Sequence, residues 1–112
     1  MRMIKPPKMR KTKVFVKGIE AGMLIELKQG TAYRFEYHED YEGLEISRTM
    51  LTDKKKYSFD KFPPFFEGLL PEGMQLEGLL KIRKIDKDDL FSQLIAVGDE
   101  LVGVVTVKEL PE

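Results

Sequence analysis

The side chains best suited to chemistry in this chain gather in one acidic segment. His38 is the only histidine, and it stands beside Glu36, Glu39, Asp40 and Glu42. A histidine among carboxylates could bind a metal ion or act as a general acid and base. The spacing, however, lacks the glycine and the alternating ligands of a calcium-binding loop. We therefore interpret residues 38–45 as a solvated acidic loop, with a metal site as the weaker alternative.

Other catalytic patterns are missing from the sequence. The chain has no cysteine, which excludes a thiolate nucleophile, a zinc–thiolate site and a disulfide framework. Gly18 and Gly22 fall in an expected strand reversal rather than in a strand-to-helix turn, so they do not indicate a phosphate-binding loop. The metal-binding and catalytic loops of a protein kinase are also absent. We expect a module that binds a partner, with no enzymatic activity, cofactor or metal.

Length and composition indicate one soluble domain. The chain has 112 residues, of which 42% are apolar and 34% charged, values typical of a globular protein. No apolar run reaches the roughly 18 residues that a membrane span needs. The basic start has no apolar core of a secretory signal. We therefore expect a cytoplasmic protein without a membrane partner.

The net charge of zero hides an uneven distribution. Residues 1–13 carry six basic side chains and no acid, so the rest of the chain has 13 basic and 19 acidic residues. We interpret residues 1–11 as a basic flexible leader and residues 12–110 as the folded domain. A basic arm could contact nucleic acid or an acidic partner. Because basic residues do not gather elsewhere, we expect no direct binding to nucleic acid.

Apolar alternation predicts strands over residues 12–17, 23–28, 31–37, 46–52 and 101–107. The first three, joined by short turns, form an antiparallel meander in which Tyr33, Phe35 and Tyr37 share one face. The last is apolar on both faces, which is typical of a central or covered strand. With three short helices between the fourth and fifth strands, the pattern predicts an α+β fold with a small antiparallel sheet of about five strands.

The helices are expected in the second half of the chain. The first begins at Pro63 and Pro64, which suit a first helical turn, and ends before Pro71. The second carries Leu76, Leu79 and Leu80 on one side. The third follows Asp86 as N-cap, with Asp89 three residues later imitating a capping box, and stops at Gly98.

The stretch FPPFFEGLLPEGMQLEGLL, residues 62–80, organises the rest of the chain. Phe65, Phe66, Leu69 and Leu70 form one apolar face, and Pro71-Glu72-Gly73 makes an elbow between two helices. Loops of this kind lie at the surface. Met74, directly after the elbow, is a flexible and polarizable residue often used at binding surfaces. The pattern predicts a core element whose tip is either a simple turn or a contact site.

Three stretches of the chain resemble the N-terminal subdomain of HipA-type serine/threonine kinases, the toxins of bacterial toxin–antitoxin modules. They are KVFVKGIEAGMLIEL (13–27), FPPFFEGLLPEG (62–73) and DDLFSQLIAVGDELVGVVTV (88–107). Their order and spacing also match, and F-F-x-x-L-L-P-E-G is the most specific motif. The resemblance implies a small antiparallel sheet with helices that packs on a kinase core. The catalytic part of such kinases would follow residue 112, so no kinase activity is implied.

A free-standing chain of this type is similar to the HipS-type antitoxins of tripartite HipBST systems. There the kinase toxin, HipT, lacks its own N-terminal subdomain, and the separate small protein binds and inhibits it. A HipB-type helix-turn-helix DNA-binding protein is the third component. The alternative is a split or excised structural subdomain that supports the folding or substrate docking of a HipA-type kinase.

The resemblance implies that the partner-binding contact centres on the elbow. Phe66, Glu67 and Leu70 would support it, and Pro71, Glu72, Gly73 and Met74 would form its tip. HipS-like chains commonly carry tryptophan after L-P-E-G, a side chain that can enter the active-site cleft of the kinase. Methionine can fill an apolar pocket but lacks the area and the N–H group of tryptophan.

Overall fold

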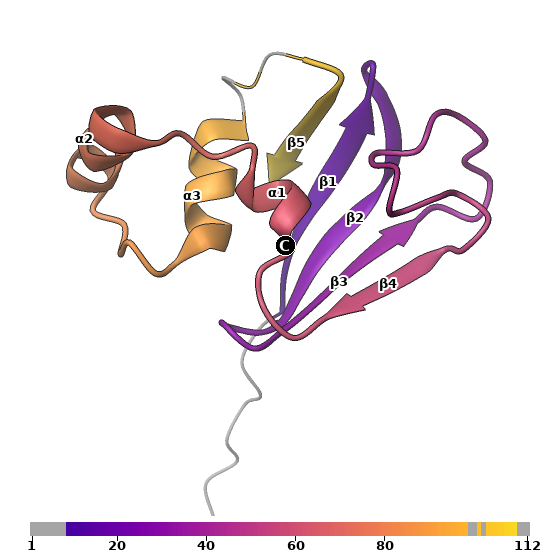
Figure 1. The fold of residues 1–112 in the computed structure, drawn as a ribbon, viewed down its shortest axis with the longest axis horizontal. Helices are drawn as coiled ribbons and strands as arrows, with labels where there is room; N and C mark the ends of the chain where they lie inside the picture. Colours follow the sequence, from indigo (N-terminus) through magenta and orange to yellow (C-terminus); the bar gives the residue numbers. More distant parts are fainter. Residues whose placement is uncertain (1–8, 99–100, 102, 110–112) are drawn as a thin grey trace, which may run out of the picture.

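The computed structural model describes residues 9–98, 101 and 103–109. Its elements, in chain order, are β1 (Arg10–Val16), β2 (Ile19–Lys28), β3 (Ala32–Tyr37), β4 (Lys56–Phe59), α1 (Pro64–Glu67), α2 (Gly73–Arg83), α3 (Leu90–Val97) and β5 (Val105–Glu109). The strands form one antiparallel sheet in the order β4-β3-β2-β1-β5 (Figure 1). This architecture confirms the expected α+β fold.

The first three strands form the expected meander. Tyr33, Phe35 and Tyr37 alternate with half-buried residues along β3 and are all buried, as one apolar face predicts. The reversal before β2 is tighter than expected, because it involves only Lys17 and Gly18. Gly22 lies inside β2, where a Cβ would stand 2.0 Å from the carbonyl oxygen of Glu36. That glycine permits the close approach of β3 rather than a turn.

The prediction of a strand over residues 46–52 is wrong. This segment is a loop with one isolated bridge, between Ser47 and Met50, and the fourth strand is instead β4. The Tyr37 hydroxyl accepts a hydrogen bond from the Ile46 N–H at 2.9 Å and donates one to the Met50 carbonyl oxygen. The segment therefore folds around a buried hydroxyl, and Ile46 and Met50 become buried without the alternation of a strand.

The last strand is also placed differently from the expectation. β5 pairs with β1 at the edge of the sheet, so residues 101–107 do not form a central strand. Only Val107 is buried in β5, and Val104 just before it is exposed. Val107 packs against Gly98, at the end of α3, where an added Cβ would come within 2.8 Å of the Val107 carbonyl oxygen. The close contact with the end of α3 thus helps to hold β5 at this edge of the sheet.

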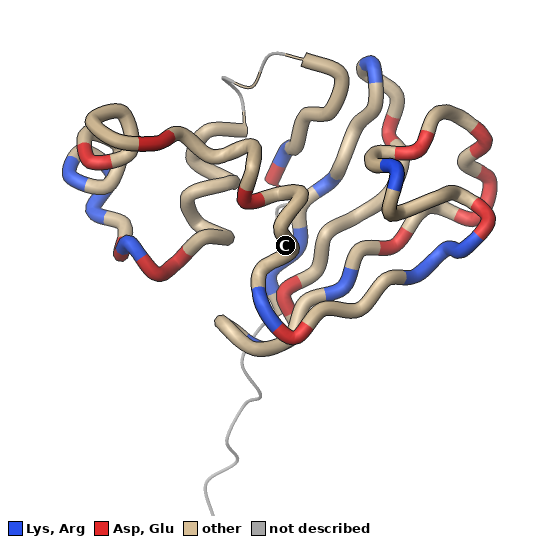
Figure 2. Tube along the Cα trace, in the orientation of Figure 1, with Lys and Arg blue, Asp and Glu red and all other residues tan. Residues whose placement is uncertain are grey.

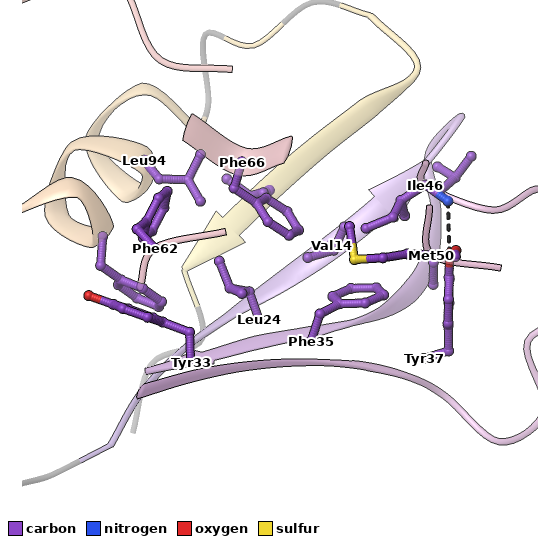
Figure 3. Close-up of a cluster of buried hydrophobic side chains, with 14 of the residues drawn as sticks. Val14, Leu24, Tyr33, Phe35, Tyr37, Ile46, Met50, Phe62, Phe66 and Leu94 are labelled. Atoms are coloured by element: carbon purple, nitrogen blue, oxygen red, sulfur yellow. Dashed lines mark hydrogen bonds between the residues drawn. The ribbon is translucent and has the colours of Figure 1, made fainter. Parts of the chain in front are cut away.

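The hydrophobic core lies between the sheet and the helices α1 and α3. Leu24 and Phe35 from the sheet are completely buried, as are Phe66 from α1 and Leu94 from α3 (Figure 3). The rings of Phe35 and Phe66 are 5.9 Å apart at a tilt of 46°. Fully burying one such side chain stabilises the fold by about 1.5 to 3 kcal/mol. α1 is therefore attached to the sheet through Phe66.

Arg10 joins the start of β1 to β2 and α3. Its guanidinium binds both oxygens of Glu26, at 2.6 and 2.9 Å, and one oxygen of Asp89, at 2.9 Å. It also lies 5.0 Å from the ring centroid of Phe91. Glu26 is nearly buried, and it accepts a further hydrogen bond from the Tyr33 hydroxyl at 3.1 Å. Residues 10 and 11 of the expected leader thus belong to β1, and residues 1–8 lie outside the described part of the chain.

The N-cap of α3 is Asp89 rather than the expected Asp86. The Asp89 carboxylate accepts hydrogen bonds from the Ser92 N–H, at 3.1 Å, and the Ser92 hydroxyl, at 2.7 Å. Burial alone would raise the pKa of Asp89, but hydrogen bonds from Arg10 and Ser92 outweigh it and lower that pKa. Asp86 instead contacts α3 through its backbone, because its carbonyl oxygen accepts a hydrogen bond from the Gln93 side-chain amide at 3.1 Å.

Candidate partner-binding site

The elbow begins with a very short helix fixed to the core. Pro64 occupies the first position of α1, where a missing N–H leaves no hydrogen bond unmade. Phe66 is fully buried, and the ring of Phe65 meets it edge-on with centroids 5.2 Å apart. Phe66 was expected to support the partner-binding contact. Because it is buried, it can do so only from inside, by fixing the elbow to the core.

The chain then continues as a turn. The Leu69 and Leu70 N–H groups donate to the carbonyl oxygens of Phe66 and Glu67, each at 3.1 Å. Glu67 is exposed, whereas Leu70 and Pro71 are half-buried. The turn carries its own backbone hydrogen bonds, so it can project from the core in a defined conformation.

The tip is the most exposed part of the elbow. Glu72 is the N-cap of α2 in extended conformation, and its side chain makes no capping hydrogen bond. Gly73 has φ of +59°, a left-handed conformation that favours glycine. Met74 follows with 88% of its surface exposed. The structure thus places Glu72, Gly73 and Met74 together at the surface, on the base formed by Phe66 and Leu70.

α2 itself is loosely attached to the rest of the molecule. It packs against α3, and none of its residues is buried. Leu76, Leu79 and Leu80 are half-buried on one side, as the sequence predicted. The opposite side carries a second apolar residue in addition to Met74, because Ile82 is 80% exposed. Sequence reasoning missed Ile82, although its spacing of eight residues from Met74 could have revealed it.

An open groove of about 560 Å³ runs beside this exposed side. It is lined by Pro71, Met74, Gln75, Gly78, Leu79, Ile82, Arg83 and Val97. Gly78 has no side chain, and a Cβ placed there would meet nothing within 4 Å. The elbow tip, the groove and Ile82 therefore form one continuous surface with apolar side chains and few charges.

Charges divide along α2. Glu72 is its N-cap and Glu77 lies in its first half, whereas Lys81 and Arg83 lie in its last turn and Lys84 is its C-cap (Figure 2). Basic residues at a helix C-terminus and an acidic residue at its N-terminus complement the helix dipole.

The acidic segment over residues 38–45 is a loop, as expected. His38 binds Glu20 of β2, with its Nε2 2.6 Å from a carboxylate oxygen, rather than the carboxylates of the loop. Among the described residues, no group of three or more histidine, cysteine, aspartate or glutamate side chains could hold a metal ion. Within the same residues, no helix is long and apolar enough to cross a bilayer.

Comparison with known proteins identifies the family. The model of the HipA N-terminal domain matches residues 12–108. A Haemophilus influenzae protein, described only as uncharacterized, is 31% identical over 100 residues, which cover 89% of this chain and 92% of the relative. A solved structure described as the N-terminal domain of HipA toxin superposes with a TM-score of 0.71 and 26% identity, covering 100% of this chain and 99% of that one. The chain therefore belongs to the HipA N-terminal domain family.

Proposed function

We propose that this chain is an antitoxin that binds and inhibits a HipA-like serine/threonine kinase toxin of the HipT type. Family membership supports a role in a toxin–antitoxin module, and the match is confined to the N-terminal domain of the toxin. The observation that carries the proposal is Met74, a large apolar side chain exposed at the tip of an elbow anchored in the core. Such a residue has the chemistry of an anchor for an apolar pocket on a partner.

In this proposal the contact surface is the elbow. Glu67, Pro71, Glu72, Gly73 and Met74 meet the kinase directly, and Leu70 supports the turn. Phe66 acts indirectly, because it fixes the elbow to the sheet. Since the partner is a cytoplasmic kinase, the chain would act in the cytoplasm. A HipB-type helix-turn-helix protein is a candidate third component of the complex.

Co-expression with a HipA-like kinase toxin of the HipT type tests the proposal. We expect the chain to relieve growth arrest and to co-purify with the kinase. Met74→Asp should weaken both effects, because it places a charge in an apolar contact. A matched control is Leu44→Asp, which changes an exposed leucine in the loop after β3. Persistent growth arrest without an isolable complex would refute the proposal.

The second candidate function is structural. The solved relative is described as a domain of the toxin itself, which favours a split N-terminal subdomain that supports the folding or substrate docking of a HipA-type kinase. An antitoxin lowers the phosphorylation activity of the kinase, whereas a supporting subdomain raises it. A phosphorylation assay with and without the chain therefore separates the two functions.

A further inference from the structure

Met74 is the residue of the elbow tip that a mild oxidant can change chemically. The chain has no cysteine and six methionines, and the structure describes the exposure of Met9, Met23, Met50 and Met74. Met74 is 88% exposed, Met9 46% and Met50 3%, whereas Met23 is half-buried in β2. Because an oxidant must reach the sulfur atom, Met74 is the described methionine that should react first.

The local structure leaves the Met74 side chain uncovered. Met74 is the second residue of α2, a helix in which no residue is buried. Residues four apart lie on the same face of a helix, and the residue four positions after Met74 is Gly78. A Cβ placed at Gly78 would meet nothing within 4 Å. The position that would cover Met74 from the next turn of α2 therefore carries no side chain, and a small oxidant can approach from solvent.

We propose that Met74 is a redox-sensitive site, and that its oxidation to methionine sulfoxide weakens the binding of the elbow to the kinase. The effect on binding rests on the proposed function, whereas the reactivity of Met74 does not. The oxidant is a peroxide. Hydrogen peroxide transfers one oxygen atom to the Met74 sulfur, so that the O–O bond breaks, an S–O bond forms, the sulfur loses two electrons and the peroxide leaves as water. A flexible apolar side chain thereby becomes a polar one.

Oxidation at Met74 should change the contact without changing the fold. In the free chain the sulfoxide oxygen stays hydrated, because this residue is almost fully exposed. In an apolar contact it loses that water, and a polar group buried without a hydrogen-bond partner weakens binding by about tenfold or more. Met50 provides the contrast, since it belongs to the hydrophobic core and its oxidation would disturb packing. The position of Met74 thus separates loss of binding from loss of stability.

The change at Met74 is also reversible. Methionine sulfoxide reductases restore the thioether with two thiols as reductant, which become a disulfide while the oxygen leaves as water. An antitoxin with this site would release its kinase when peroxide accumulates and bind it again after reduction. The elbow tip would therefore respond to the redox state of its surroundings through Met74, although the chain has no cysteine.

Peptide mass spectrometry of the purified chain during treatment with hydrogen peroxide tests the site itself. Met74 should be oxidised roughly twice as fast as Met9, in line with their exposed fractions, and Met50 should react last. The Tm of the chain oxidised at Met74 should stay within about 2 °C of the untreated value, as for other changes at exposed positions. Oxidation of Met50 as fast as that of Met74, or unfolding of the chain when Met74 is oxidised, would overturn the site.

The phosphorylation rate of a HipT-type kinase, measured with chain treated by peroxide, tests the effect on binding. The peroxide is removed before the kinase is added, so that only the chain is oxidised. The concentration of chain that gives half-maximal inhibition should rise about tenfold, and methionine sulfoxide reductases of both stereospecificities, with a dithiol, should restore it. Each chain is compared with its own untreated sample. Peroxide should not change the inhibition by Met74→Leu, whereas Met9→Leu should respond as the unmodified chain does. A Met74→Leu chain that responds to peroxide, or a loss that the reductases do not reverse, would overturn the proposal.

These measurements distinguish failure of the redox site from failure of the proposed function. If the untreated chain does not inhibit the kinase, the proposed function fails and the effect on binding falls with it, while the mass spectra alone decide whether Met74 is the reactive methionine. If the untreated chain inhibits the kinase and the chain oxidised at Met74 inhibits it equally well, the redox proposal is overturned and the proposed function stands.

Discussion

The two glycines of α2 should respond in opposite directions to the same substitution. Gly73 has φ of +59°, which an alanine adopts only with strain, whereas Gly78 lies in the helix interior. Neither position has an atom within 4 Å of an added Cβ, so conformation alone decides the outcome. Gly73→Ala should lower the free energy of unfolding by about 1 kcal/mol. Gly78→Ala should raise it by about 0.8 kcal/mol, the difference in helix propensity.

Thermal denaturation measures both changes. For a domain of this size 1 kcal/mol corresponds to about 4 °C in Tm, so Gly73→Ala should melt about 4 °C lower and Gly78→Ala about 3 °C higher. Gly73→Asn should fall between them, because asparagine tolerates positive φ better than alanine does. Amide hydrogen exchange in α2 gives the same comparison for local opening, with about a fivefold change per kcal/mol. Equal effects of the two alanine variants would refute the proposed conformation of the elbow.

Two further substitutions test the buried polar contacts that hold the sheet and the helices together. Arg10→Met should cost about 3 kcal/mol, because it leaves the nearly buried Glu26 without its cation, and it should lower Tm by about 12 °C; a loss under 3 °C would contradict the network. Tyr37→Phe should cost about 1 to 3 kcal/mol, because the Ile46 N–H and the Met50 carbonyl oxygen lose their partner. Burial raises the pKa of Tyr37 to about 12, so its contribution is complete below pH 10, the unfolded value, and is lost as pH rises through 12. Alkaline unfolding of the unmodified and Tyr37→Phe chains checks this, and identical pH profiles would contradict it.

Local patterns predicted the meander and the elbow because their signals are short-range. The alternation of Tyr33, Phe35 and Tyr37 follows from the period of a strand, and Pro64 and Pro71 delimit α1 and the turn by the geometry of proline. The α+β class followed from the order of these elements.

The errors arose where contacts between distant segments decide the structure. Residues 46–52 alternate like a strand, but the hydroxyl of Tyr37, nine residues before Ile46, turns them into a loop. Arg10 was assigned to the basic leader. Nothing in the local sequence indicates that its guanidinium forms hydrogen bonds with Glu26 and Asp89, which are distant in the chain. The last strand was expected to be central or covered, because apolar content alone does not tell whether a strand has one neighbour or two.

The partner-binding residues remain a prediction. The sequence placed Met74 at an exposed tip, and its side chain is indeed almost fully exposed. It did not show that Ile82 extends the exposed apolar surface along α2. The exposure of Ile82 depends on how α2 is oriented against α3, which helical periodicity leaves open.

The central claim is that this chain inhibits a HipA-like kinase through its elbow. The most direct measurement is the phosphorylation rate of that kinase at increasing concentrations of the chain. The rate should fall to a low plateau with the unmodified chain and with Leu44→Asp, and it should fall much less with Met74→Asp. A rate that rises with added chain, or an inhibition that Met74→Asp leaves unchanged, would contradict the account.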